Sequence, residues 1–142
     1  MLQVYVDTSV LAYAIGGPHP EREACRSVVA AVPSGGVELH ANVEVIQELL
    51  FHRMRRIDVL RAAKQAQAAA AACVLHSFDA RVLDLSIDLV LTVPGLRGRD
   101  AVHAATALHH GLTTVVSTDA AFDAVPGLTR ATPADLAAQL AG

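Results

Sequence analysis

The chain has 142 residues, 53% hydrophobic and only 18% charged, so a single domain with a substantial core is expected over residues 1–142 and an intrinsically disordered chain is excluded. Its two cysteines, Cys25 and Cys73, form neither a CxxC pair nor a disulfide framework, and no basic leader or apolar run of about 20 residues is present, which indicates a reduced cytoplasmic protein without a membrane anchor. The net charge of −3 argues mildly against nucleic-acid binders, which are usually basic.

Predicted strands and helices alternate along the chain. Short β-branched runs predict strands, and apolar residues at helical spacing predict helices. The expected elements in chain order are a strand at 3–6, helices at 9–15 and 20–32, a strand at 37–40, helices at about 42–54 and 57–72, an extended segment at 74–77, helices at 79–92 and 99–110, and a strand at 113–116. Strands joined by helices need crossover connections, so the pattern predicts a three-layer α/β domain with a parallel sheet.

Two aspartates directly follow predicted strands. Asp7 follows the strand at 3–6, and Asp119 follows the strand at 113–116 after two hydroxyl residues. Because ligands of open α/β sheets bind beyond the carboxyl ends of the strands, these acids mark a candidate site. Each one taken alone is also explained as the N-cap of the next helix, since aspartate is common at such junctions.

Two further acids lie in predicted helices. Asp100 stands at the start of the helix at 99–110, where the helix dipole favours a carboxylate, so capping alone accounts for it. Glu48 lies more than one turn inside its helix among apolar residues, where no backbone donor needs an acid, and this position favours a ligand. Glu44, one turn earlier on the same face, is an alternative, although the helix dipole explains an acid in the first turn.

Four carboxylates gathered at one edge of a sheet repel one another unless cations lie between them. Oxygen ligands without cysteine or clustered histidine select hard ions such as Mg²⁺ or Mn²⁺ rather than zinc. Such an ion can activate a water molecule and stabilise the leaving oxygen of a phosphodiester. The sequence therefore predicts a metal site for phosphodiester cleavage at Asp7, Glu48, Asp100 and Asp119.

At these residues the chain resembles the PIN-domain family, and in particular its VapC-like bacterial toxins. Four segments carry the resemblance in order along nearly the whole chain: Val-Asp-Thr-Ser-Val-Leu at 6–11, Asn42 to Leu50 with Glu48, Arg-Asp-Ala-Val-His-Ala-Ala-Thr-Ala at 99–107, and Val-Ser-Thr-Asp-Ala-Ala-Phe at 116–122. The resemblance implies a PIN-like three-layer α/β/α domain with a mostly parallel central sheet. It also implies an Mg²⁺- or Mn²⁺-dependent endoribonuclease in which Asp7, Glu48, Asp100 and Asp119 are the catalytic, metal-binding acids.

The same resemblance implies a biological setting. The chain would be the toxin of a toxin–antitoxin pair, a homodimer inhibited by a VapB-like antitoxin whose C-terminal segment covers the active site. Its substrate would be a structured cellular RNA, a tRNA or an rRNA, and selection by RNA shape leaves no code in the sequence that identifies which one. The alternative is a catalytically inactive PIN-fold module that binds RNA or protein.

Four polar residues are candidates for hydrogen bonds to water on the metal: Thr8, Ser9, Ser117 and Asp123. For the hydroxyls, capping and turn formation are equally good explanations. Asn42 stands where the family usually carries serine or threonine, a change that keeps the helix cap without the hydroxyl.

Arginines supply the candidate RNA contacts. Arg53, Arg55 and Arg56 cluster after His52, and Arg99 precedes Asp100. A solvated helix face or a subunit contact explains such a cluster equally well. With three phenylalanines, two tyrosines and no tryptophan, base stacking is not expected to dominate RNA binding.

Histidine and lysine positions bear on the remaining alternatives. His103 lies three residues after Asp100 on the same side of the helix, although a helical histidine flanked by apolar residues is more often packed than catalytic. A phosphoacceptor receiver domain needs a lysine near its end, and the single lysine here is Lys64 in a middle helix. A haloacid-dehalogenase-type phosphatase needs an acid two residues after the first aspartate, where Ser9 stands.

Overall fold

A five-stranded parallel sheet forms the centre of the molecule. The computed structural model describes all 142 residues, and the sheet has the strand order β3-β2-β1-β4-β5. The strands are β1 Leu2–Val6, β2 Val37–Asn42, β3 Cys73–His76, β4 Thr114–Val116 and β5 Thr129–Ala131. Every neighbouring pair is parallel. The first strand of the chain therefore lies in the middle of the sheet.

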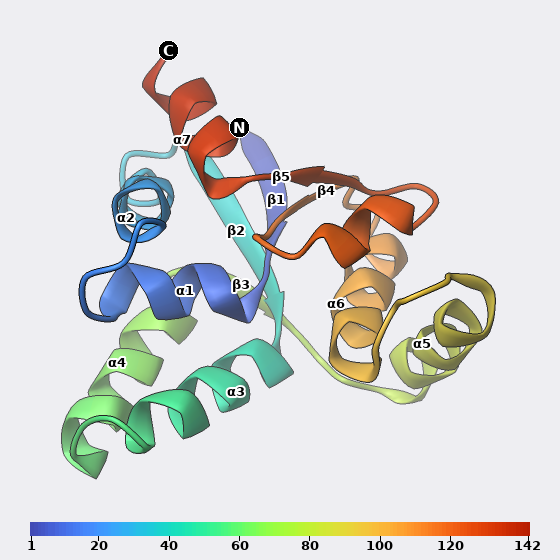
Figure 1. The fold of residues 1–142 in the computed structure, drawn as a ribbon, viewed down its shortest axis with the longest axis horizontal. Helices are drawn as coiled ribbons and strands as arrows, with labels where there is room; N and C mark the ends of the chain where they lie inside the picture. Colours follow the sequence, from blue (N-terminus) through green and yellow to red (C-terminus); the bar gives the residue numbers. More distant parts are fainter.

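Helices cover both faces of this sheet (Figure 1). They are α1 Thr8–Ile15, α2 Arg22–Ala30, α3 Val43–Met54, α4 Val59–Ala71, α5 Ala80–Thr92, α6 Gly98–His109 and α7 Pro133–Ala141, with a short 3₁₀ helix, η1, at Ala120–Ala124. Helices α1 to α4 lie on one side, with α7 packed on α2, and the pair α5 and α6 lies on the other. The predicted three-layer α/β/α fold is confirmed. No helix is long and apolar enough to cross a membrane.

The expected elements exist, with shifted ends. The helix expected at 20–32 is α2 Arg22–Ala30, because Pro20 and Glu21 lie before its first turn and a turn begins at Ala31. The helix expected at 57–72 begins one residue after Asp58, whose carboxylate accepts a hydrogen bond from the Arg61 amide and caps it. Three elements had not been predicted: η1, β5 and α7.

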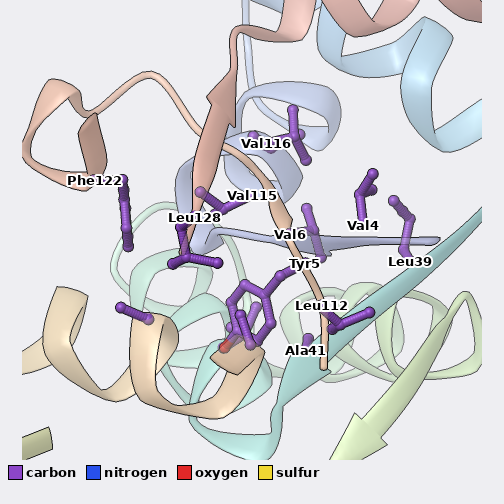
Figure 2. Close-up of a cluster of buried hydrophobic side chains, with 14 of the residues drawn as sticks. Val4, Tyr5, Val6, Leu39, Ala41, Leu112, Val115, Val116, Phe122 and Leu128 are labelled. Atoms are coloured by element: carbon purple, nitrogen blue, oxygen red, sulfur yellow. The ribbon is translucent and has the colours of Figure 1, made fainter. Parts of the chain in front are cut away.

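The strand register separates two buried faces. Val4 and Val6 lie on one face of β1, and Tyr5 lies on the other (Figure 2). The pairing places Val116 beside Val6 and Val115 beside Tyr5, so each face of β1 continues across β4. All five side chains are fully buried, and the Tyr5 ring packs near His103 of α6. This packing fixes α6 against the sheet.

Candidate functional site

The four predicted acids converge beyond the carboxyl ends of the central strands. Asp7 directly follows β1, and Asp119 follows β4 after two residues. Asp100 lies in the first turn of α6, and Glu48 lies in the middle of α3. Ser117 contacts both Asp7 and Asp119, and His103 lies close to both Asp7 and Glu48. The structure thus brings together residues that are more than a hundred positions apart in the chain.

Helix capping does not explain Asp7. It precedes α1, but its side chain makes no capping hydrogen bond. Instead, Asp7 Oδ2 accepts hydrogen bonds from Ser9 Oγ at 3.1 Å and from Ser117 Oγ at 2.7 Å. Ser117 Oγ also accepts a hydrogen bond from the Asp119 amide at 2.9 Å. The hydroxyls of Ser9 and Ser117 therefore orient the carboxylate, and their contact with metal-bound water stays a prediction.

Asp100 and Asp119 form a close carboxyl pair. Burial, the hydrogen bond to Asp119 and the nearby negative charges raise the pKa of Asp100 to about 7. The pKa of Asp119 is lowered, because it accepts hydrogen bonds from Asp100 and from the Ala121 amide. Like charges this close disfavour ionisation of both groups at once, and Asp100 is the member of the pair that binds a proton more readily. Asp119 does cap η1, as the simpler explanation predicted, but Asp100 caps no helix.

Glu48 faces Asp7 across a small polar cluster. Its Oε2 accepts a hydrogen bond from Thr8 Oγ1 at 3.2 Å and lies 3.7 Å from Arg99 Nη1. Burial works to raise the pKa of Glu48, but the proximity of His103, Arg99 and Thr8 outweighs it, so that the pKa is lowered. Glu48 is therefore ionised at neutral pH. Thr8 contacts the carboxylate itself, as Ser9 and Ser117 do with Asp7.

His103 is a functional candidate, although the sequence pattern favoured a packing role for it. It is 1% exposed, and its Nε2 lies 3.3 Å from Glu48 Oε1 and 3.9 Å from Asp7 Oδ1. These contacts fall outside hydrogen-bond geometry, so Nε2 has no hydrogen-bond partner. A buried polar atom directed between two carboxylates is a mark of a functional site. The single signal in the sequence was its spacing of three residues from Asp100.

The orientation of His103 depends on Tyr5. The Tyr5 hydroxyl accepts a hydrogen bond from the Asn42 amide at 3.0 Å and lies 2.7 Å from His103 Nδ1. Since that oxygen already accepts from Asn42, its own proton is assigned to His103 Nδ1, which leaves the Nε2–H directed at the acids. Burial raises the pKa of Tyr5 far above its usual range, so the hydroxyl stays protonated. The Asn42 side-chain oxygen accepts a hydrogen bond from the Glu44 amide and so caps α3, and the side-chain nitrogen donates to Thr106 Oγ1.

Several predicted residues lie outside this acid cluster. Asp123 pairs with Arg130 through two hydrogen bonds of 2.8 and 3.1 Å and stays exposed. The expectation that it assists at the metal is therefore not supported by its position, because Arg130 occupies both carboxylate oxygens. Arg53 is buried and donates to Gln65 at 2.9 Å, which departs from the expected exposed cluster.

The other predicted arginines stay near the surface. Arg56 donates to the His52 carbonyl at 2.9 Å, and Arg55 is exposed. The guanidinium of Arg99 lies beside Glu48 with a side chain that is 79% exposed. Arg99 and Arg56 also border a common hollow with Glu48. These two are the arginines best placed to meet an anionic ligand at the acids.

The donor set fits a hard divalent cation. In this conformation no three histidine, cysteine, aspartate or glutamate side chains form a group that encloses an ion. Burial, the hydrogen bond to Asp119 and the charges of Asp119 and Asp7 raise the pKa of the half-buried Asp100, and a bound cation would offset those charges. All the candidate ligands are carboxylate oxygens, the type that Mg²⁺ and Mn²⁺ prefer. The cluster therefore has the composition and the electrostatic strain of a metal site.

A groove of about 560 Å³ runs from the acids along α1 and α3. Its walls include Asp7 and Glu48 at one end, the glycine-rich turn after α1, and arginines of α3. A second hollow of about 500 Å³ continues past Phe51 and Arg99. Acids at one end and arginines along the walls give the groove the charge pattern expected for holding a phosphodiester chain over a cation.

Comparison with known proteins assigns the chain to a family. The model of the PIN domain matches residues 4–128, which include all four acids. The chain belongs to the PIN-domain family, and the resemblance drawn from the sequence is confirmed.

Relatives within this family share most of the chain. It is 38% identical over 122 residues to ribonuclease VapC7 of Mycobacterium tuberculosis, covering 84% of this chain and 83% of the relative. It is 31% identical over 129 residues to ribonuclease VapC13 of the same organism, covering 89% and 98%. The fold is similar to the crystal structure of VapBC2 from Rickettsia felis bound to a promoter DNA fragment, with a TM-score of 0.71, 14% identity and coverage of 92% and 98%.

Proposed function

We propose that this chain is a metal-dependent endoribonuclease of the VapC type, the toxin of a toxin–antitoxin pair, which cleaves structured cellular RNA such as tRNA or rRNA with Mg²⁺ or Mn²⁺. The observation that carries the proposal is the convergence of Asp7, Glu48, Asp100 and Asp119 beyond the carboxyl ends of β1 and β4. The relatives named ribonucleases support the reaction, because their similarity extends over most of the chain.

The residues of the site would have separate roles in phosphodiester cleavage. Asp7, Asp100 and Asp119 would hold the cation, and Glu48 completes the set. When bound, such a cation supplies Lewis acidity and lowers the pKa of water for attack on phosphorus. Ser9 and Ser117 keep Asp7 in place through two hydrogen bonds.

The protonation state of Asp100 should change when the site binds a cation. Asp100 holds a proton in the metal-free chain and releases it when the cluster is loaded, since only the ionised carboxylate binds a cation. Glu48 is already ionised and can accept a hydrogen bond from a water molecule at the scissile bond. Arg99, largely exposed beside Glu48, can bind a phosphate oxygen. Metal affinity should therefore fall as the pH drops below about 7.

The partners proposed for this chain are a second copy and a VapB-like antitoxin. Structures with this fold include a toxin–antitoxin complex from Klebsiella pneumoniae and VapBC2 from Rickettsia felis. Helix α5 carries a partly exposed apolar stripe, Leu83, Ile87, Val90 and Leu91, beside an apolar groove against α6. An uncovered stripe of this kind supports an oligomer, because it leaves apolar side chains in water. Sedimentation of the isolated chain would measure its mass.

Cleavage of RNA by the purified chain tests the proposed function. Total RNA incubated with Mg²⁺ should be cut, and both EDTA and the variant Asp119→Asn should abolish cutting. The matched control is Asp135→Asn, an exposed acid at the start of α7, which should retain full activity. If RNA binds equally with and without metal and is never cut, the chain is a binding module. Sequencing the new RNA ends in cells that express it identifies the substrate.

A further inference from the structure

Two aromatic rings stack on each other at the end of the groove away from the acids. Tyr13 of α1 and His19 of the following turn have ring centroids 4.2 Å apart and an interplanar angle of 20°. Both side chains line the groove that begins at Asp7 and Glu48. Tyr13 is partly exposed and His19 is exposed, so the stacked pair presents a flat surface to the groove. Nothing in the proposed cleavage reaction uses this pair.

The pair is held in one orientation before any ligand binds. His19 Nδ1 accepts a hydrogen bond from the Glu21 amide at 3.1 Å, which fixes the ring and places its proton on Nε2. The turn between the rings contains Gly16, where a side chain would approach the Ala12 carbonyl oxygen to 2.9 Å. The tight turn therefore brings the rings together, and a ligand that stacks on them loses little entropy in ordering them.

Spacing along α1 connects the pair to the acids. Tyr13 and Ser9 are four residues apart, so they lie on the same helix face about 6 Å apart along the axis. Ser9 Oγ contacts Asp7 Oδ2 at 3.1 Å. The opposite wall of the groove carries Arg53 and Arg56 of α3. Arg53 is anchored by Gln65 through its Nε, and its Nη1 lies 3.8 Å from the position that a Cβ on Gly16 would take.

We propose that the Tyr13–His19 pair is a subsite for one unpaired base of the RNA, next to the nucleotide whose phosphodiester lies over the acids. Aromatic side chains bind bases of any identity by stacking, and arginines on the opposite wall hold the backbone. The inference rests on the proposed ribonuclease function. It also refines the expectation from composition, because one of the five aromatic residues, Tyr13, lines the groove and His19 supplies a second ring beside it.

The test compares a single-stranded RNA with an abasic oligomer of the same length, which has the same phosphates but no bases. Binding of each labelled oligomer is measured by fluorescence anisotropy in EDTA, where nothing is cleaved. The parent should bind the RNA more tightly than the abasic oligomer. Tyr13→Leu and His19→Asn should each weaken RNA binding about tenfold, the effect of losing one stacked base, without changing abasic binding. Asparagine at 19 retains an acceptor for the Glu21 amide while removing the ring.

Two controls separate stacking from other roles. Tyr13→Phe keeps the ring and should keep the parent's affinity for RNA. Arg56→Gln should weaken both oligomers alike, because it acts on phosphates. Thermal melting of each variant checks that it is folded, and the exposed His19 makes its variant the safer of the two if Tyr13→Leu unfolds.

Three results would overturn the subsite. Equal binding of RNA and abasic oligomer by the parent, unchanged RNA binding by both ring variants, or equal losses for both oligomers would each do so. Loss of binding to an antitoxin C-terminal peptide with no change in RNA binding would assign the rings to the protein partner instead. Because binding is measured without metal, failure of the parent to cut RNA would refute the nuclease function and leave the binding result standing.

Discussion

Replacing Asp100 with asparagine should stabilise the metal-free chain while removing activity. In the parent, burial and the neighbouring Asp119 raise the pKa of Asp100 from its ordinary value of 3.8 to about 7. Such a rise corresponds to about 4 kcal/mol of unfavourable ionisation, which solvent around a half-buried carboxyl reduces to about 1–2 kcal/mol. An asparagine amide can donate to Asp119 in place of the shared proton. The variant loses a favourable helix-dipole interaction of about 0.5 kcal/mol, which is the smaller effect.

The pH dependence gives the sign of the effect. A raised pKa means that the folded chain binds this proton more tightly than the unfolded chain does, so the metal-free parent loses stability as the pH rises from about 4 to about 7. The variant has no proton there to lose. Its advantage should be near zero at about pH 4 and reach about 1–2 kcal/mol above pH 7, or about 3–8 °C in Tm for a chain of this size.

Melting curves with EDTA and with Mg²⁺ measure both sides of this prediction. A cation that binds only the folded state adds about 2.7 kcal/mol at a hundred times its Kd, an increase that the parent should show and Asp100→Asn should largely lose. The control is Asp58→Asn, which retains the cap of α4 and should leave Tm and the Mg²⁺ response unchanged. A variant that melts below the parent without metal yet keeps the full Mg²⁺ increase would show Asp100 to be structural and would refute the reasoning.

Three other substitutions test separate contacts. Tyr5→Phe removes the hydroxyl that orients His103, so urea unfolding should show a loss of about 1–3 kcal/mol, and the rate of RNA cleavage should fall as well. Asp123→Asn should leave the RNA cleavage rate close to that of the parent, because Arg130 engages that carboxylate outside the cluster; loss of all cleavage would place it in the site after all. Arg99→Gln should lower the slope of log affinity for RNA against log salt by about 1, and an unchanged slope would exclude a phosphate contact.

The local sequence was enough to predict most of the fold. Strand–helix alternation required a parallel sheet, and acids after two strands had to meet at one edge of it. The last helix, α7, was missed although Thr132 caps it through the Asp135 amide and Pro133 occupies its first turn, a signal that is present in the sequence. Strand β5 carries no comparable signal, because its three residues become a strand only by pairing with β4.

Side-chain partners distant in sequence were the part that could not be predicted. Periodicity places His103 on the buried face of α6 but cannot show that Tyr5, 98 residues earlier, directs its Nε2 toward the acids. The sequence places Arg53 in a basic run that is expected to be exposed. In the structure its guanidinium is buried, because it donates a hydrogen bond to Gln65 of the next helix. The same limit applies to the Ser117 hydroxyl, whose contact with Asp7 depends on the register between β1 and β4.

Because β1 lies at the centre of the sheet, the sheet cannot be completed before β4 has been synthesised. β1 is made first, yet one of its two neighbours is β4, and the hydrogen bond between Asp7 and Ser117 spans 110 residues. On the ribosome, β1 therefore remains without one of its two neighbours until β4, at residues 114–116, has emerged. The acid cluster is complete only once residue 119 has emerged, since any shorter fragment lacks at least Asp119.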